Sequence, residues 1–184
     1  MIEAIVELDG NILLWIQEAV RNPILTPVFT FITTLGNAGM IWIIFCILLL
    51  SKKSTRRIGA MGILALLGSA LINNLLLKNL VERPRPFDII EGLQPIVMRP
   101  KDFSFPSGHT GSSFAVATVF YRNLPKRFGV WMLLLAALMG VSRVYVGVHY
   151  PTDVLAGMLV GIAIGYVAEV IVKQLEEKKK FKEA

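Results

Sequence analysis

The segment Phe105-Pro106-Ser107-Gly108-His109-Thr110-Gly111 lies directly before a long apolar run and predicts how the rest of the chain is arranged. Pro106 ends whatever precedes it, and Ser107 is a favourable N-cap for a helix that continues through residues 114–121. The start of a helix has free backbone N–H groups and a partial positive charge, which together favour a bound anion. Gly108 lets that anion approach the backbone closely, and His109 adds a titratable ring. We therefore expect an anion site at this helix start.

The composition is that of an integral membrane protein. Of the 184 residues, 54% are hydrophobic and 17% are charged, and the mean hydropathy of +0.62 is too high for an ordinary soluble domain. The charges gather in clusters between long uncharged runs, as in membrane helices joined by polar loops. The net charge of +6 does not indicate nucleic-acid binding, because the basic residues lie at the edges of the apolar runs. The single cysteine, Cys46, excludes an intrachain disulfide.

The apolar segments predict an all-α, polytopic membrane helix bundle with about five transmembrane helices. These helices are expected at residues 38–51, 58–77, 108–121, 128–147 and 152–172. Upstream, apolar residues such as Ile5 and Leu8 recur at helical spacing among acidic ones, so residues 2–21 are expected to form an interfacial amphipathic helix. Pro23 and Pro27 favour a further short helix before the first span.

We interpret the whole chain, 1–184, as one membrane-embedded domain. Residues 1–36 would hold the N-terminal surface and short helices, residues 38–172 the transmembrane core, and residues 173–184 a cytoplasmic tail. Gly157, Gly161 and Gly165 recur four apart in the last span, which favours close helix packing inside the bundle over a dimer face. The oligomeric state stays open. Asn73 and Asn74 are expected to form hydrogen bonds between helices rather than to bind a ligand.

Basic residues predict the orientation of the spans. The short basic segments 52–57, 122–127 and 173–182 lie an even number of crossings apart, so all three can be cytoplasmic, as the positive-inside rule requires. Residues 78–108 and 143–153 then lie together on the opposite face. The sequence therefore predicts a multi-pass protein of the cell membrane with a cytoplasmic C-terminus and a site on the extracytoplasmic face.

The side chains expected on that face suit a phosphate group. Lys78, Arg85 and Arg143 supply positive charge, and the arginines add fork-shaped donors that match phosphate oxygens. The N–H groups from Ser107 to His109 supply further donors to the oxygens of a phosphoryl transition state.

The two histidines of the chain suit phosphoryl transfer. One histidine can attack phosphorus if a carboxylate holds its other ring nitrogen, and Asp153 lies four residues after His149. The second histidine, His109, can then protonate the departing oxygen. No cluster of carboxylate, cysteine and histidine residues predicts a metal site or a cofactor, so the arginines are expected to supply the positive charge.

Three motifs resemble the signature of the type 2 phosphatidic acid phosphatase superfamily, which also includes vanadium haloperoxidases. They are KNLVERPRP at 78–86, PSGH at 106–109 and SRVYVGVHYPTD at 142–153. The resemblance covers about residues 60 to 170. In the family, six residues separate the lysine from its Arg-Pro pair, which selects Arg85 and leaves Arg83 without an assigned role. The family usually has six spans, so the N-terminal topology departs from its pattern.

The resemblance implies a metal-independent phosphatase that forms a covalent phosphohistidine. His149 would be the nucleophile, Asp153 its orienting partner and His109 the general acid. The phosphate-binding residues that it implies are Lys78, Arg85, Ser107, Gly108 and Arg143.

We expect the substrate to be a lipid phosphate that enters from the outer leaflet. Undecaprenyl diphosphate, phosphatidylglycerol phosphate and phosphatidate are the candidates, and recycling of the polyprenyl carrier suits an outward-facing site best. A lipid phosphotransferase would keep the same residues and differ in its acceptor. A transporter or a catalytically silent scaffold is disfavoured, because no internal repeat is visible and both histidines are present.

Overall fold

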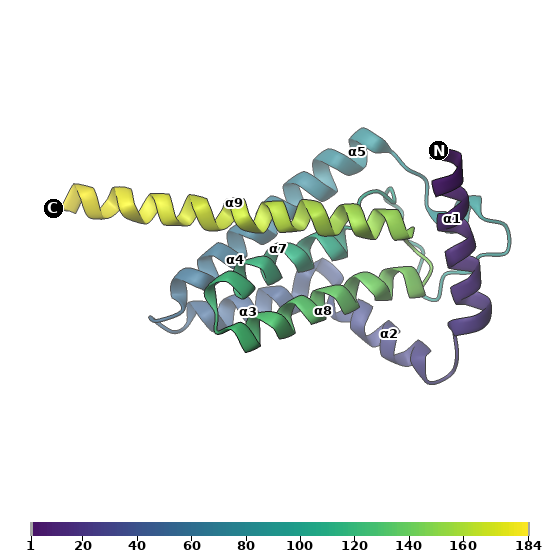
Figure 1. The fold of residues 1–184 in the computed structure, drawn as a ribbon, viewed down its shortest axis with the longest axis horizontal. Coiled ribbons are helices and arrows are strands. Elements are labelled where there is room, and N and C mark those ends of the chain that lie inside the picture. Colours follow the sequence, from purple (N-terminus) through teal and green to yellow (C-terminus); the bar gives the residue numbers. More distant parts are fainter. Residues whose placement is uncertain (1, 184) are drawn as a thin grey trace.

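The computed structural model describes residues 2–183, and within that range the chain forms helices and no strands (Figure 1). The helices are α1 (Ile2–Trp15), η1 (Ile16–Val20), α2 (Leu25–Leu35), η2 (Asn37–Gly39), α3 (Met40–Leu50), α4 (Arg56–Ser69), η3 (Ala70–Leu77), α5 (Lys78–Val81), α6 (Pro86–Ile89), α7 (Gly108–Asn123), α8 (Lys126–Tyr145) and α9 (Pro151–Glu183). The expected all-α bundle is confirmed.

Helix α7 begins where the sequence predicts. Ser107 has extended backbone angles, and its Oγ accepts hydrogen bonds from the backbone N–H of Thr110 at 3.4 Å and from the Thr110 hydroxyl at 2.8 Å. This N-cap leaves the first N–H groups of α7 directed out of the helix start.

Helix α7 is the centre of the bundle. Its side chains from Phe114 to Phe120 are all buried, and it packs against α3, α4, α8 and α9. The indole of Trp42, from α3, is fully buried and donates a hydrogen bond of 2.8 Å to the Ser113 hydroxyl. The start of α7 is therefore held in place by four other helices.

The glycine stripe of α9 packs against α7. A Cβ atom added at Gly161 would lie 2.4 Å from the carbonyl oxygen of Gly111, and one at Gly165 would lie 2.4 Å from that of Ala115. The stripe thus brings two backbones into close contact inside the bundle, as favoured from the sequence. Asn73 donates to Ser69 of its own helix at 2.9 Å, so the expected hydrogen bond to another helix is wrong for this residue.

Fewer helices meet the requirements for a membrane span than the five predicted. Arg56–Ile89, Lys126–Tyr145 and Pro151–Lys178 are long and apolar enough, and the pair Leu25–Leu35 with Asn37–Leu50, bent by 53°, makes a possible fourth. Helix α7 occupies the remaining predicted segment but has only 16 residues. Because its neighbours cover its sides, α7 does not have to match the apolar thickness of a bilayer.

Helix α1 lies across the end of the bundle opposite the C-terminus (Figure 1). Its exposed face carries Ile5, Leu8 and Trp15, each at least 46% exposed, which fits the expected interfacial helix. The face that contacts the protein holds Leu13 and Asp9, whole residues that are 1% and 2% exposed. An acidic side chain on the buried face was not expected.

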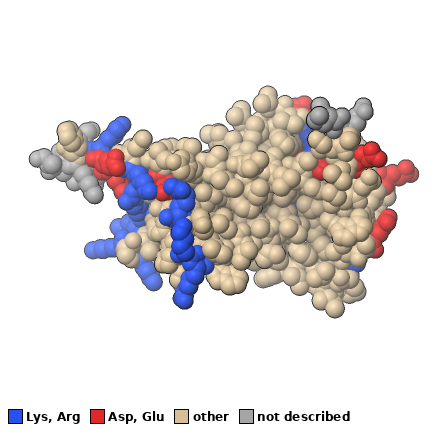
Figure 2. All heavy atoms as spheres, in the orientation of Figure 1, with Lys and Arg blue, Asp and Glu red and all other residues tan. Residues whose placement is uncertain are grey.

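Charged side chains lie mainly at the two ends of the molecule. In Figure 2, blue Lys and Arg side chains gather toward the end where α9 terminates, and most of the red Asp and Glu side chains on the visible face lie at the α1 end. A wide uncharged band separates the two groups, as expected for a surface in contact with lipid.

Candidate active site

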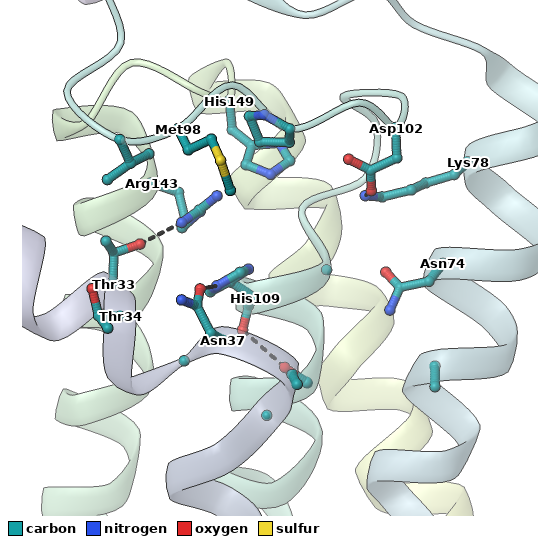
Figure 3. Close-up of a pocket in the computed structure, with 18 of the residues that line it drawn as sticks. Thr33, Thr34, Asn37, Asn74, Lys78, Met98, Asp102, His109, Arg143 and His149 are labelled. Atoms are coloured by element: carbon teal, nitrogen blue, oxygen red, sulfur yellow. Dashed lines mark hydrogen bonds and ion pairs between the residues drawn. The ribbon is translucent and has the colours of Figure 1, made fainter.

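A cavity of about 940 Å³ opens at the α1 end of the bundle, where the start of α7, the end of α8 and the start of α9 meet. The predicted site residues that line it are Lys78, Arg85, Gly108, His109, Arg143 and His149. Figure 3 shows that the side chains of Lys78, His109, Arg143 and His149 face a common space, although they come from α5, α7, α8 and the loop before α9. Ser107 and Asp153 are fully buried behind the cavity wall, where the Ser107 N–H donates to the Asp153 carbonyl oxygen at 3.0 Å.

Two of the cations share one carboxylate. Lys78, the first residue of α5, forms an ion pair with Asp102, and the Arg85 Nη2 atom lies 2.6 Å from Asp102 Oδ1. Arg85 Nε also donates to the Asp102 carbonyl oxygen at 2.9 Å. Burial alone would raise the pKa of Asp102, but the hydrogen bonds and charges of Lys78 and Arg85 outweigh it and lower this pKa to about 2. Asp102 is therefore an anion at any physiological pH.

The third cation lacks an anionic partner. Arg143, in the last turn of α8, is 4% exposed, and its guanidinium donates to the Thr33 hydroxyl of α2. Its Nε atom is buried and has no hydrogen-bond partner among the described residues. Burying a guanidinium without a counter-ion is costly, so this side chain favours a bound anion in the cavity.

The loop between α8 and α9 places His149 at the cavity wall. Gly147 has φ of +78°, a left-handed conformation that side chains disfavour, and it allows the chain to turn between the two helices. His149 Nε2 lies 3.0 Å from the Nη1 atom of Arg85. Because a guanidinium only donates, Nε2 must accept, and the proton of the neutral ring is then on Nδ1.

Asp153 lies on the other side of the His149 ring. Its Oδ2 atom is 3.5 Å from His149 Nδ1, too long for a strong hydrogen bond, and it accepts from the Ser104 hydroxyl at 2.5 Å and from the Tyr150 N–H at 3.0 Å. The carboxylate can therefore face the Nδ1 proton while its own position is fixed by other donors. Burial first, and then the charges of Arg85 and Arg143, hold the pKa of His149 well below its usual value, which keeps the ring neutral.

His109 enters the cavity from the start of α7. Its Nε2 atom lies 3.0 Å from Asn37 Oδ1, in the short η2 helix, and Figure 3 shows these side chains side by side. Gly108 lies in close contact with Asn74, because a Cβ there would lie 2.3 Å from the Asn74 amide oxygen. A larger residue at this position would clash with Asn74, so the start of α7 can pack beside η3 only with glycine here.

Several residues around the cavity were missed from the sequence. Asp102 lies in the long polar connection without any pattern that marks it as a partner of two distant cations. Thr33 comes from the segment 1–36, expected to hold only surface and short helices, and Asn37 lies between that segment and the first predicted span. Asn74 was expected to serve helix packing. Arg83 does not line the cavity, and it binds Asp153 Oδ1 from behind at 2.6 Å. Among the side chains that the structure describes, no group of three or more from His, Cys, Asp or Glu is placed to hold a metal ion.

A helix bundle with two histidines and three buried cations around one cavity defines a membrane protein that handles phosphate groups. The family model described as the PAP2 superfamily matches residues 59–177, more than half of the chain. The protein therefore belongs to the PAP2 superfamily, and the resemblance inferred from its three motifs is confirmed.

Relatives and solved structures agree with this assignment. The chain is 31% identical over 161 residues to an undecaprenyl-diphosphatase of Sulfolobus acidocaldarius, covering 85% of this chain and 77% of that protein. It is 33% identical over 177 residues to phosphatidylglycerophosphatase B of Bacillus subtilis, covering 89% and 82%. The crystal structure of Aquifex aeolicus LpxE matches with a TM-score of 0.75 and 30% identity, over 89% of this chain and 93% of that one. The protein is a membrane phosphatase of lipid phosphates.

Proposed function

We propose that this phosphatase removes a phosphate group from a lipid diphosphate or monophosphate through a covalent phosphohistidine at His149. The observation that carries the proposal is the charge of the cavity. Lys78, Arg85 and Arg143 are each at most 5% exposed, and Asp102 is the one carboxylate among the described residues that line the cavity with them. A phosphate group would supply the missing negative charge and accept the unused donors of Arg143.

The rest of the cavity fits a lipid. Beyond the charged groups, its wall continues along the apolar side chains of Ile43 from α3 and of Leu66 and Leu67 from α4. A substrate with a charged head and an apolar chain could occupy both parts at once, whereas a small soluble phosphate ester would leave the apolar wall uncovered.

The proposed reaction has two steps. The phosphate first replaces His149 Nε2 as the acceptor of the Arg85 N–H, and the freed Nε2 lone pair then attacks phosphorus. An N–P bond forms, and the bond from phosphorus to the leaving oxygen breaks as His109 gives that oxygen a proton. Water then attacks the phosphohistidine and loses a proton to His109, and inorganic phosphate leaves with the ring restored. The Nδ1 proton stays on the ring, where the Asp153 carboxylate faces it and stabilises the positive charge that the ring gains. The cations stabilise the charge that develops on the phosphoryl oxygens.

Among substrates, undecaprenyl diphosphate is our first candidate, followed by phosphatidylglycerol phosphate and phosphatidate. The names of the Sulfolobus and Bacillus relatives support the first two. A phosphotransferase would form the same phosphohistidine and then transfer the phosphoryl group to a lipid acceptor instead of to water. The two activities differ in whether inorganic phosphate appears.

We further propose that the cavity faces the extracytoplasmic side of the cell membrane and that the C-terminus is cytoplasmic. The basic end of the molecule in Figure 2 is the end opposite the cavity, and the positive-inside rule assigns it to the cytoplasm.

The test is phosphate release by the purified protein in detergent micelles from a panel of lipid mono- and diphosphates. We expect turnover of at least one lipid phosphate with and without EDTA, and none with His149→Ala of unchanged melting temperature. Lys101→Ala, at an exposed position of the polar connection between α6 and α7, is the control variant and should keep full activity. Normal turnover by folded His149→Ala would refute the nucleophile, and transfer to a lipid without phosphate release would favour the phosphotransferase.

A further inference from the structure

One carboxylate outside the cavity is buried for no reason that the proposed reaction supplies. Asp9 belongs to α1, a helix at the surface of the bundle, yet its side chain is 3% exposed. The neighbouring acidic residue Glu7 is exposed. A carboxylate is buried at a considerable cost unless its partners compensate for the lost water, so the contacts of Asp9 require an explanation.

Asp9 contacts the start of α9. Its Oδ1 atom accepts a hydrogen bond of 3.1 Å from the backbone N–H of Thr152, and its Oδ2 atom accepts one from the Thr152 hydroxyl. Thr152 is the residue directly before Asp153. These bonds cap the first turn of α9, but a neutral acceptor would serve that purpose as well, so capping does not explain the charge.

The charge of Asp9 balances that of the Arg83 guanidinium. The Nη2 atom of Arg83 lies 2.9 Å from Asp9 Oδ2, and its Nη1 atom lies 2.6 Å from Asp153 Oδ1. The guanidinium also lies over the ring of Tyr150, 3.7 Å from the ring centre. Arg83 thus bridges two carboxylates with its two Nη atoms, that of Asp9 in the surface helix and that of Asp153 beside His149.

This arrangement divides the two oxygens of Asp153. Arg83 binds Oδ1, whereas Oδ2 accepts from Ser104 and from the Tyr150 N–H and lies 3.5 Å from His149 Nδ1. With Asp9 as a second counter-ion, Arg83 can fix the Asp153 carboxylate without neutralising it. If the charge of Asp9 were removed, Asp153 alone would balance the guanidinium and would accept the Nδ1 proton of His149 less strongly.

We infer that Asp9 is a positioning residue for the Asp153–His149 pair, acting through Arg83. The inference rests on the proposed function, because the pair matters when His149 gains positive character as the N–P bond forms. Asp9 has no contact with the cavity, so its loss should lower kcat and leave KM unchanged.

The experiment uses two variants that break the Asp9–Arg83 ion pair, one from each partner. Asp9→Asn keeps an oxygen for the Thr152 N–H and removes the charge, and Arg83→Gln removes the cation. We expect each to lower kcat about tenfold, the lower end of the effect of residues that orient a reacting group indirectly, with KM within about twofold of the wild type. The double variant should lose no more than the stronger single variant, because both changes break one chain of contacts.

Glu7→Gln, at an exposed acid of the same helix, is the matched control and should behave as the wild type. Melting temperatures in the same micelles identify variants that fold, and if one single variant does not fold, the other still tests the link. A folded Asp9→Asn or Arg83→Gln with wild-type kcat would overturn the inference, as would losses that multiply in the double variant. The wild type and His149→Ala, measured in parallel, report on the proposed function separately.

Discussion

Replacing Gly157 by alanine is expected to separate α9 from the start of α7 and to lower both stability and turnover. The added Cβ would lie 2.6 Å from the Ser107 carbonyl oxygen and 3.3 Å from the Thr110 Cβ atom. Ordinary contact begins at 3.4 Å, so the two helices must separate by about 0.8 Å, the difference between 3.4 and 2.6 Å. The neighbouring atom is backbone, so rotation of a side chain cannot relieve the clash.

The size of both effects follows from this displacement. Overpacking of this kind costs about 1–3 kcal/mol, which corresponds to a fall of about 2–12 °C in melting temperature for a chain of this size. Ser107 to His109 would move relative to Asp153 and His149, which lie on the other side of the contact. A misplacement near 1 Å can cost about a hundredfold in rate, so we expect kcat to fall by one to two orders of magnitude.

The assay measures melting temperature, phosphate release and oligomeric state in the same micelles. Gly165→Ala is the matched control, because its Cβ would lie 2.4 Å from the Ala115 carbonyl oxygen, two turns farther from the cavity. It should lose similar stability and much less turnover. Wild-type stability and turnover in Gly157→Ala would refute the packing argument. Equal loss of turnover in both variants would refute the local displacement, and a change of oligomeric state alone would favour a dimer face.

Two further predictions concern charge in the cavity. The acid limb of kcat/KM against pH should lie well below 6.5, the ordinary pKa of a histidine, because burial and the neighbouring cations keep His149 neutral. Protonation of His149 also links pH to folding stability. Stability should fall as pH drops below 6.5, because the unfolded chain then binds the His149 proton and the folded chain does not. An acid limb at or above 6.5 would contradict the neutral His149 on which the kinetic and the stability predictions both depend. Asp102→Asn should tighten inhibition by orthovanadate about fivefold, because the half-exposed carboxylate that pairs with Lys78 and Arg85 competes for them with about 1 kcal/mol. Weaker inhibition would mean that Asp102 instead holds the two cations in place.

The sequence predicts what depends on local pattern. The N-cap at Ser107, the apolar runs and the glycine spacing of α9 each follow from neighbours along the chain, and the structure agrees with them. The motifs also indicate which side chains to expect at one face, because their order and spacing resemble a known family. Both kinds of evidence refer to residues within a short stretch or within a recognised motif.

What the sequence does not predict is pairing between distant segments. Arg83 and Arg85 are nearly identical in local context, yet Arg85 faces the cavity and Arg83 faces away, toward Asp9 and Asp153. Each arginine directly precedes a proline, and the two differ in which partner the tertiary fold offers. Thr33 and Asn37 likewise reach the cavity only because α2 bends into α3 beside it.

The balance of charge explains why this cavity stays open for a substrate. Among the described side chains, three buried cations beside a single carboxylate leave an excess of positive charge, and Arg143 in particular has a hydroxyl as its one partner. A second carboxylate in the wall would satisfy the cations and stabilise the empty fold, but it would also compete with phosphate. The carboxylates that could have played that part, Asp9 and Asp153, are instead held on the far side of His149 by Arg83. The fold therefore separates the acids that orient the histidine from the cations that bind the anion, and Arg83 is the residue that keeps them apart.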